Sequence, residues 1–245
     1  MTDGERLLRL ALERGALRYG DFTLSSGQKS KYYFDGRLLS LDPEGAYLIG
    51  KAILPILNEA GAQAIGGPTL GADPIVAAVA LTSHLNDSSI PAFIVRKDAK
   101  SHGTGQLVEG PLAPGSRVAI VDDTCTTGAS LFHAIEAAEA AACTVVKVVA
   151  ILDRHQGGSE ELKRRGFDFT SLLASTPEGE VRVVQSESVD APSRSSRFWN
   201  PPTIEELAFE QGVHPVKDLE QVFGGWPEDA DFESFLKAIR RSRTE

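Results

Sequence analysis

Short apolar segments alternate with helical patterns from residue 43 to residue 175. The apolar runs are nearly continuous, as in "TVVKVVAILD" at 144–153, which indicates strands that are buried on both faces. Helices between such strands return the chain by right-handed crossovers and cover both sides of a parallel sheet. The pattern predicts a doubly wound, mostly parallel α/β domain. Its strands are expected at 64–67, 91–97, 116–123, 144–153 and 167–174, and its helices at 43–61, 72–86, 128–142 and 159–166.

The composition is typical of a globular protein without a broad positive charge. The 245 residues are 42% hydrophobic and carry a net charge of −9, so we expect neither nucleic acid nor a membrane surface as a partner. The first 15 residues predict an amphipathic helix rather than a signal peptide, and no apolar run is long enough for a membrane span. Cys125 and Cys143 alone make no disulfide framework. These features predict a cytoplasmic protein.

The segments on either side of the α/β core differ from it in character. Residues 22–35, "FTLSSGQKSKYYFD", predict a β-hairpin that turns near Gly27, as part of a hood formed from residues 1–40. Residues 176–245 hold 14 acidic and 8 basic side chains, which is −6 of the net charge. We expect a main domain at 1–175, a Ser- and Pro-rich linker at 176–202, and a C-terminal helical extension at 203–245 whose partner the sequence does not identify.

The segment "VAIVDDTCTTGAS", residues 118–130, carries the most specific chemistry. Its apolar strand ends in Asp122 and Asp123, at the sheet edge where ligands of doubly wound sheets bind. The backbone N–H groups of 125–130 then converge at a helix N-terminus, which favours a bound phosphate. Two carboxylates would repel that phosphate, so we expect them to bind paired sugar hydroxyls of the same ligand, a phosphorylated ribose. The alternative is that the two aspartates only end the strand and cap the helix.

This segment resembles the 5-phosphoribosyl-1-diphosphate (PRPP) binding motif of the type I phosphoribosyltransferases. With "DFTLSSGQKSKYYFD", "GGPTLGADPI" and "FIVRKDAKSHGTGQLVEG", the chain is similar to the orotate phosphoribosyltransferase family from about residue 5 to 175. The resemblance implies that family's fold and the Mg²⁺-dependent transfer of phosphoribose from PRPP to orotate, giving orotidine 5′-monophosphate and pyrophosphate. It also implies that Mg²⁺ is held through PRPP oxygens near the aspartates, rather than by the protein alone. The implied PRPP contacts here are the catalytic pair Asp122 and Asp123, then Thr124, Cys125, Thr126, Thr127, Gly128, Ala129 and Ser130.

A cluster of cations stands out in this acidic chain at 96–110, "RKDAKSHGTGQLVEG". Glycines beside the charges favour a lid that closes on a polyanion, where cations stabilise the departing pyrophosphate. An imidazole such as that of His102 could protonate the leaving group. By resemblance, residues 97–109 form a lid that reaches the neighbouring subunit of a homodimer, and the alternative is a solvated surface loop. The PRPP contacts expected here are Arg96, Lys97, Lys100 and His102, of which Lys100 and His102 are catalytic.

The base is expected to bind between the hairpin and the strand that ends at residue 153. By resemblance, the orotate site comprises Tyr33, Phe34, Thr126 and Arg154. An arginine at the carboxyl end of a strand can bind a carboxylate through two hydrogen bonds, and orotate has the carboxylate that uracil and the purines lack. The alternatives are that the two rings only pack the hairpin onto the sheet and that Arg154 forms a surface ion pair.

Two positions depart from the family pattern. Some members have a lysine where this chain has Ser25, and some have one where it has Gly71, in the turn "GGPTLGADPI". Lys29 or Lys31 could supply the missing charge of the hairpin, while the glycines of the turn allow close backbone approach to pyrophosphate. Two other functions stay open: phosphoribosyl transfer to uracil or a purine, and regulation by PRPP binding without turnover.

Overall fold

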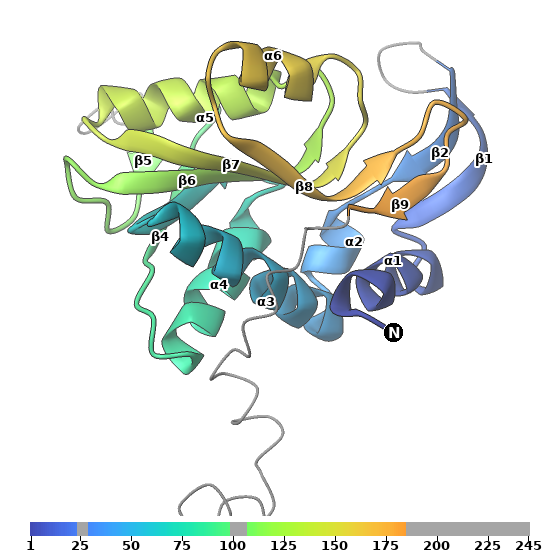
Figure 1. The fold of residues 1–245 in the computed structure, drawn as a ribbon, viewed down its shortest axis with the longest axis horizontal. Coiled ribbons are helices and arrows are strands. Elements are labelled where there is room, and N and C mark those ends of the chain that lie inside the picture. The colour runs from blue at the N-terminus through green and yellow to red at the C-terminus, as the bar shows by residue number, and fades with distance from the viewer. Residues whose placement is uncertain (24–28, 99–106, 185–245) are drawn as a thin grey trace, which may run out of the picture. The chain divides into compact units, whose positions relative to one another are not determined.

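The computed structural model of the chain describes residues 1–23, 29–98 and 107–184. Within these residues one sheet has the strand order β5-β4-β3-β6-β7-β8-β9 (Figure 1). The five inner strands run parallel, and the edge strands β5 and β9 are antiparallel to their neighbours. The predicted doubly wound, mostly parallel sheet is confirmed. The strands are β3 (Ala64–Pro68), β4 (Ala92–Val95), β5 (Val108–Glu109), β6 (Arg117–Cys125), β7 (Thr144–Asp153), β8 (Phe169–Ser175) and β9 (Val181–Val183).

Helices cover both faces of this sheet (Figure 1). On one face lie α5 (Ala129–Ala140) and α6 (Gly158–Arg164), and on the other lie α1 (Asp3–Glu13), α2 (Arg37–Ser40), α3 (Pro43–Ala60) and α4 (Asp73–Leu85). Alternate residues of β6 pack into the two apolar cores, one on each face of the sheet. Ala119 and Val121 belong to the core shared with α3 and α4, whereas Val118 and Ile120 belong to the core shared with α5. Because both layers are apolar, the strands are apolar throughout.

Helix α3 shows how local sequence sets the helix ends. Asp42 accepts hydrogen bonds from two backbone N–H groups of the first turn, and Gly61 ends the helix in the left-handed conformation. Pro55 is expected from the sequence to kink this helix or end its regular bonding, yet the helix continues through it to Ala60. Pro55 is exposed, so water can satisfy the carbonyl that lacks an intrahelical partner there.

The N-terminal hairpin forms a two-stranded sheet of its own from β1 (Leu17–Thr23) and β2 (Lys29–Phe34). The predicted hairpin is present, although its first strand begins earlier than expected, and the predicted turn at Gly27 lies outside the described residues. The hydroxyl of Tyr19 accepts a hydrogen bond of 3.0 Å from the backbone N–H of Val181. This contact ties the hairpin to the edge of the main sheet.

The main sheet continues past residue 175, where the sequence places the end of the domain. Thr176 accepts a hydrogen bond of 2.9 Å from the N–H of Gly179, and the chain turns back so that β9 pairs antiparallel with β8. The expectation that the linker begins at 176 is therefore wrong for 176–183, because the Pro and Gly residues there form a tight turn between strands. The rest of the expected linker and the extension at 203–245 lie outside the described residues.

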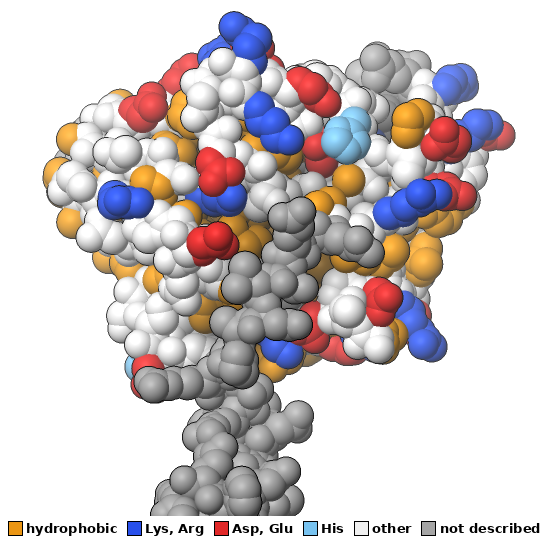
Figure 2. All heavy atoms as spheres, in the orientation of Figure 1, with side chains coloured by type: hydrophobic (Ala, Val, Ile, Leu, Met, Phe, Trp, Pro, Cys, Tyr) orange, Lys and Arg blue, Asp and Glu red, His pale blue; other side chains and the backbone are white. Residues whose placement is uncertain are grey.

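The charged side chains of the described residues are mixed in sign over the face drawn in Figure 2. No broad basic patch of the kind that attracts nucleic acid is seen among the described side chains on that face. Of the helices in the described ranges, none combines the length and apolar character needed to cross a membrane.

Candidate active site

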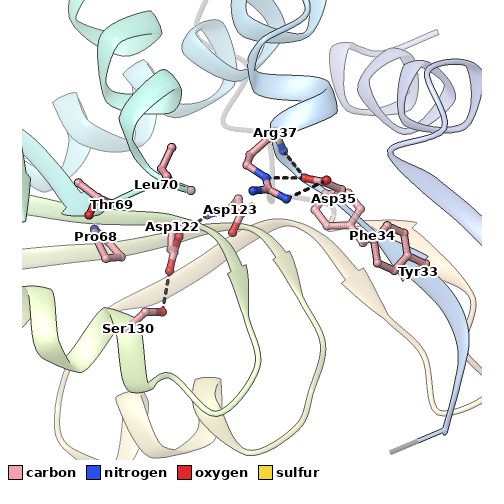
Figure 3. A pocket seen from close by; sticks show the side chains of 11 residues that line it. Tyr33, Phe34, Asp35, Arg37, Pro68, Thr69, Leu70, Asp122, Asp123 and Ser130 are labelled. Carbon is pink, nitrogen blue, oxygen red and sulfur yellow. Dashed lines mark hydrogen bonds and ion pairs between the residues drawn. The ribbon is translucent and has the colours of Figure 1, made fainter. Parts of the chain in front are cut away.

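A pocket lies where the order of the sheet reverses. The chain passes from β3 to β4 on one side and then returns to β6 on the other, so the loops after β3 and β6 diverge beyond the carboxyl ends of the strands. The pocket encloses about 320 Å³, within the range of small-molecule sites. The peptide bond between Thr69 and Leu70, in the turn after β3, is cis. Figure 3 shows the lining, which consists of Tyr33, Phe34, Asp35, Arg37, Pro68, Thr69, Leu70, Gly71, Asp122, Asp123 and Ser130.

The end of β6 presents the predicted aspartate pair to this pocket. Asp122 is only 6% exposed and accepts hydrogen bonds from the Ser130 hydroxyl at 2.7 Å and the Asp123 N–H at 2.9 Å. Both carboxylates converge on Gly71, since a Cβ on that glycine would lie 2.8 Å from an oxygen of each aspartate. The pair therefore faces the turn after β3, where one ligand can contact both.

Burial makes the two carboxylates difficult to ionise together. Burial, and then the charge of Asp123, raises the pKa of Asp122, while burial and the charge of Asp35 raise the pKa of Asp123. Hydroxyl donors stabilise such carboxylates without bringing in further negative charge. The alternative in which the pair caps the next helix does not hold, because the N-cap of α5 is Gly128, without any side-chain cap hydrogen bond.

The loop between β6 and α5 has the form of an anion site. Gly128 adopts a left-handed φ of 79°, and the N–H groups of the first turn of α5 have no side-chain cap. Burial raises the pKa of Cys125 to about 12, so this residue is a protonated thiol in the core under α5. The other predicted PRPP contacts of the loop are placed as follows: Thr124 and Thr126 are half-buried, and Thr127, Ala129 and Ser130 are exposed.

A second loop, after β7, packs against the loop between β6 and α5 (the cradle). The Arg154 N–H donates to the Cys125 carbonyl at 2.9 Å, and the Gly158 N–H donates to the Thr126 carbonyl at 3.0 Å. The guanidinium of Arg154 lies 5.2 Å from the centre of the Tyr32 ring. Its Nε is buried without a hydrogen-bond partner in the described part of the chain. Arg154 is thus half-buried against a ring, unlike the surface ion pair of the alternative.

Side chains alternate across β2, so its three aromatic residues have different surroundings. Tyr32 and Phe34 are buried in the core shared with α3 and α4, whereas Tyr33 is half-buried and lies 4.9 Å from the Arg18 guanidinium. The predicted base-site residues Tyr33 and Phe34 both line the pocket. The sequence analysis does not predict Tyr32 as a site residue, although the period of two along the strand places it on the same face as Phe34.

Sequence comparison now identifies the family. A family model described as "Phosphoribosyl transferase domain" matches residues 58–180. Over 176 residues the chain is 43% identical to the orotate phosphoribosyltransferase of Aquifex aeolicus, with 71% of this chain and 96% of the relative covered. The chain belongs to the orotate phosphoribosyltransferase family. A second relative of that name, from Rhodopirellula baltica, is 43% identical over 167 residues, which are 66% of this chain and 86% of the relative.

Two solved structures share the fold of this chain. The orotate phosphoribosyltransferase of Mycobacterium tuberculosis in complex with PRPP is 34% identical, with a TM-score of 0.60 over 71% of this chain and 96% of that chain. A phosphoribosyltransferase from Corynebacterium diphtheriae is 32% identical, with a TM-score of 0.62 over 71% of this chain and 96% of that chain. The fold class expected from the sequence is therefore that of the orotate phosphoribosyltransferases.

The predicted lid of this family member is described only at its base. Arg96 follows β4, and its N–H donates to the Leu107 carbonyl at 2.9 Å, so the two stems of the lid are joined next to the β4–β5 ladder. Lys97 is exposed, and neither it nor Arg96 is among the described residues that line the pocket. The predicted catalytic residues Lys100 and His102 lie outside the described residues.

Sequence reasoning misses two charged residues of the pocket, Asp35 and Arg37. They lie between β2 and the first turn of α2, and Arg37 donates to both carboxylate oxygens of Asp35, at 2.9 and 3.0 Å. Gly36 packs against Asp123, since a Cβ on this glycine would lie 2.6 Å from the Asp123 Cβ. Asp35 is the last residue of the predicted hairpin segment and Arg37 follows it closely, but no spacing or composition there signals a pocket residue.

Proposed function

We propose that this protein transfers the phosphoribosyl group of PRPP to orotate, forming orotidine 5′-monophosphate and pyrophosphate in pyrimidine biosynthesis. The observation that carries the proposal is the aspartate pair at the end of β6, which faces the pocket and is followed directly by the uncapped N-terminus of α5. That order suits a ligand with paired hydroxyls beside a phosphate. Relatives of this chain are named orotate phosphoribosyltransferases, and one of that name has been solved in complex with PRPP.

In this proposal the residues act by positioning and charge. The ribose hydroxyls donate to Asp122 and Asp123, while the 5-phosphate accepts from the first turn of α5. As the bond from C1 to the diphosphate breaks and the bond from C1 to orotate N1 forms, positive charge develops on the ribose, and the two carboxylates stabilise it. The diphosphate keeps the electron pair, with positive charge from Lys100 and a proton from His102, while orotate N1 loses its own proton to solvent as the new bond forms. No covalent intermediate with the protein is needed.

Magnesium fits this site as an ion shared with the ligand. The described residues hold no group of three or more His, Cys, Asp or Glu side chains that could bind a metal ion. Two carboxylates that converge on one point, together with ligand oxygens, make the oxygen-rich donor set that Mg²⁺ prefers. Asp122 and Asp123 would therefore hold the ion jointly with PRPP. When bound, Mg²⁺ supplies positive charge that offsets the diphosphate.

Arg154 is expected to select orotate. Replacing Arg154 by Ala should raise KM for orotate at least about tenfold, because the hydrogen bonds to the substrate carboxylate are lost. KM for PRPP should change little. The measurement is steady-state kinetics with each substrate varied in turn. Arg165→Ala is the matched control, since Arg165 also lies over a ring, 4.2 Å from the centre of Phe132, but its guanidinium pairs with Glu161 at 2.7 Å. An unchanged KM for orotate in Arg154→Ala would remove Arg154 from the base site.

We also propose a cytoplasmic homodimer in which the lid, 97–109, completes the neighbouring subunit's site, as the family resemblance implies. Exposed leucines on neighbouring elements, Leu38 of α2 and Leu81 of α4, support an apolar contact between subunits. Sedimentation equilibrium of the full chain tests this proposal, and the mass of a single chain at assay concentrations would contradict it.

The decisive test of the function is an assay of the purified full chain with PRPP, Mg²⁺ and one base at a time. Orotate should be consumed, as followed by ultraviolet absorbance, and uracil, hypoxanthine and adenine should not. Turnover of uracil or a purine would establish the same chemistry on another base. PRPP binding in calorimetry without turnover of any base would indicate a regulator. No uptake of PRPP in the presence of Mg²⁺ would refute the proposal.

A further inference from the structure

The residues that line the pocket bring more negative than positive charge to it. Three of them are carboxylates, Asp35, Asp122 and Asp123, and Arg37 is the one cation among the described lining residues. PRPP carries a monophosphate and a diphosphate, so it would enter a site whose fixed charge is negative. A guanidinium within the pocket is the described group that can offset this repulsion.

Asp35 holds this guanidinium in one orientation. The Nε and Nη2 atoms of Arg37 donate to the two carboxylate oxygens at 2.9 and 3.0 Å, and the Arg37 backbone N–H donates to the same carboxylate at 3.1 Å. The hydrogen bonds from Arg37 lower the pKa of Asp35, so both partners stay ionised. The two side-chain hydrogen bonds to Asp35 use two of the five guanidinium N–H groups, and both N–H groups of Nη1 remain for another acceptor.

The same guanidinium acts on the aspartate pair. Figure 3 shows Arg37 reaching in between Asp35 and Asp123. The positive charge of Arg37 opposes the rise in the pKa of Asp123 that burial causes. Gly36 brings the backbone against Asp123, so the segment that carries Arg37 adjoins the predicted ribose contact. An anionic group next to the ribose hydroxyls would therefore lie near Arg37.

Two of the anionic groups of the substrates have other partners in the proposed reaction. The 5-phosphate faces the uncapped first turn of α5, and the orotate carboxylate faces Arg154, which lies over Tyr32 and is not among the residues lining this pocket. The turn after β3 contributes Thr69, Leu70 and Gly71 to the pocket, none of which carries a charge. The diphosphate of PRPP is the anionic group that remains for Arg37.

We propose that Arg37 binds the diphosphate of PRPP and that Asp35 is the positioning residue that orients its guanidinium. This inference rests on the proposed function and deepens it, because it assigns a ligand contact to a residue of the hood. It also gives the diphosphate a cation in a member of the family where the turn after β3 has Gly71 instead of a lysine.

The test is isothermal titration calorimetry of PRPP, with Mg²⁺ present, into the full chain and its variants. Arg37→Gln should weaken PRPP binding at least about tenfold and leave the affinity for ribose 5-phosphate, which lacks the diphosphate, unchanged. Arg37→Lys should restore part of the affinity because the charge is kept. Asp35→Asn should raise KM for PRPP by less than Arg37→Gln does, without raising KM for orotate. Arg14→Gln is the matched control: Arg14 pairs with Asp42 and is 51% exposed, against 52% for Arg37, but lies outside the pocket lining.

Each outcome separates this inference from the proposed function. Wild-type protein that takes up PRPP, with Arg37→Gln binding it equally well, would overturn the role of Arg37 and leave the function intact. An equal loss for ribose 5-phosphate would also overturn it, because Arg37 would then act only through the aspartate pair. Wild-type protein that takes up no PRPP would overturn the function itself. If Arg37→Gln does not fold, as judged by circular dichroism, the comparison of Arg37→Lys with wild type decides. Affinity reduced for PRPP but not for ribose 5-phosphate would support the contact, and affinity unchanged for both ligands or reduced equally for both would contradict it.

Discussion

Replacing Asp122 by Asn is expected to lower kcat/KM for PRPP by about 100- to 1,000-fold, because one group that stabilises the transition-state charge is lost. The same substitution should raise the melting temperature of the free protein at pH 8. The two effects have one cause. The ionised carboxylate of Asp122 binds the ligand, but its burial destabilises the protein when no ligand is bound. Steady-state kinetics and thermal unfolding of the same preparation would measure both.

The direction of the pH effect follows from the pKa of Asp122. Burial, and then the charge of Asp123, raises this pKa above its ordinary value of 3.8. A carboxyl whose pKa is raised by folding contributes stability that is fully present below its unfolded pKa and is lost as the pH rises through the folded pKa. Asparagine stays neutral and can keep the hydrogen bond with Ser130. The gain in melting temperature should therefore be larger at pH 8 than at pH 4.5.

The control for Asp122→Asn is Asp168→Asn. Asp168 is exposed and pairs with Lys147 at 2.8 Å, so its replacement removes the same charge far from any buried carboxylate. It should change neither the kinetics nor the melting temperature appreciably. If Asp122→Asn kept wild-type kcat/KM, the ribose contact would be misassigned. If it melted below the wild type at both pH values, the ionised pair would stabilise the fold instead of opposing it.

The centre of the sheet was predictable because burial on both faces leaves a continuous apolar run. In β7 the residues from Val148 to Leu152 are all fully buried, and the sequence there is apolar without interruption. β9 has three residues, with Val181 buried and Arg182 exposed, so it leaves no run to detect. α2 has four residues, which is too short for a helical period. Short elements at the rim of the sheet are fixed by tertiary contacts that a local pattern does not carry.

The site was predictable where its residues are close in sequence. Asp122 and Ser130 belong to one strand–loop–helix segment. Their hydrogen bond joins the end of β6 to the start of α5, only eight residues apart. Arg37 acts on Asp123, and Tyr32 lies against Arg154, only because the hairpin and the segment that follows it pack near the carboxyl ends of β6 and β7. No spacing or composition in the hairpin signals either contact. Long-range pairs of this kind are the part of the site that required the structure.

Replacing Gly158 by Ala is expected to raise KM for PRPP by about 100-fold, although Gly158 contacts no substrate in the proposed reaction. Gly158 begins α6 and packs directly on the cradle between β6 and α5. A Cβ there would lie 2.6 Å from the Gly128 nitrogen, 2.7 Å from the Thr126 carbonyl oxygen and 2.7 Å from the Thr127 carbonyl carbon. All three are backbone atoms, which cannot rotate away as a side chain can, so the phosphate cradle must shift.

The neighbouring glycine provides the control that separates displacement of the cradle from loss of stability. Gly157 has a left-handed φ of 94°, and a Cβ there would meet nothing within 4 Å. Gly157→Ala should therefore reduce the free energy of unfolding by about 1 kcal/mol through backbone strain, with little change in KM for PRPP. Gly158→Ala should combine a lower melting temperature with the loss of PRPP affinity, measured by calorimetry below the melting transition. Equal PRPP affinity in the two variants would show that the contact between α6 and the cradle does not hold the phosphate site in place.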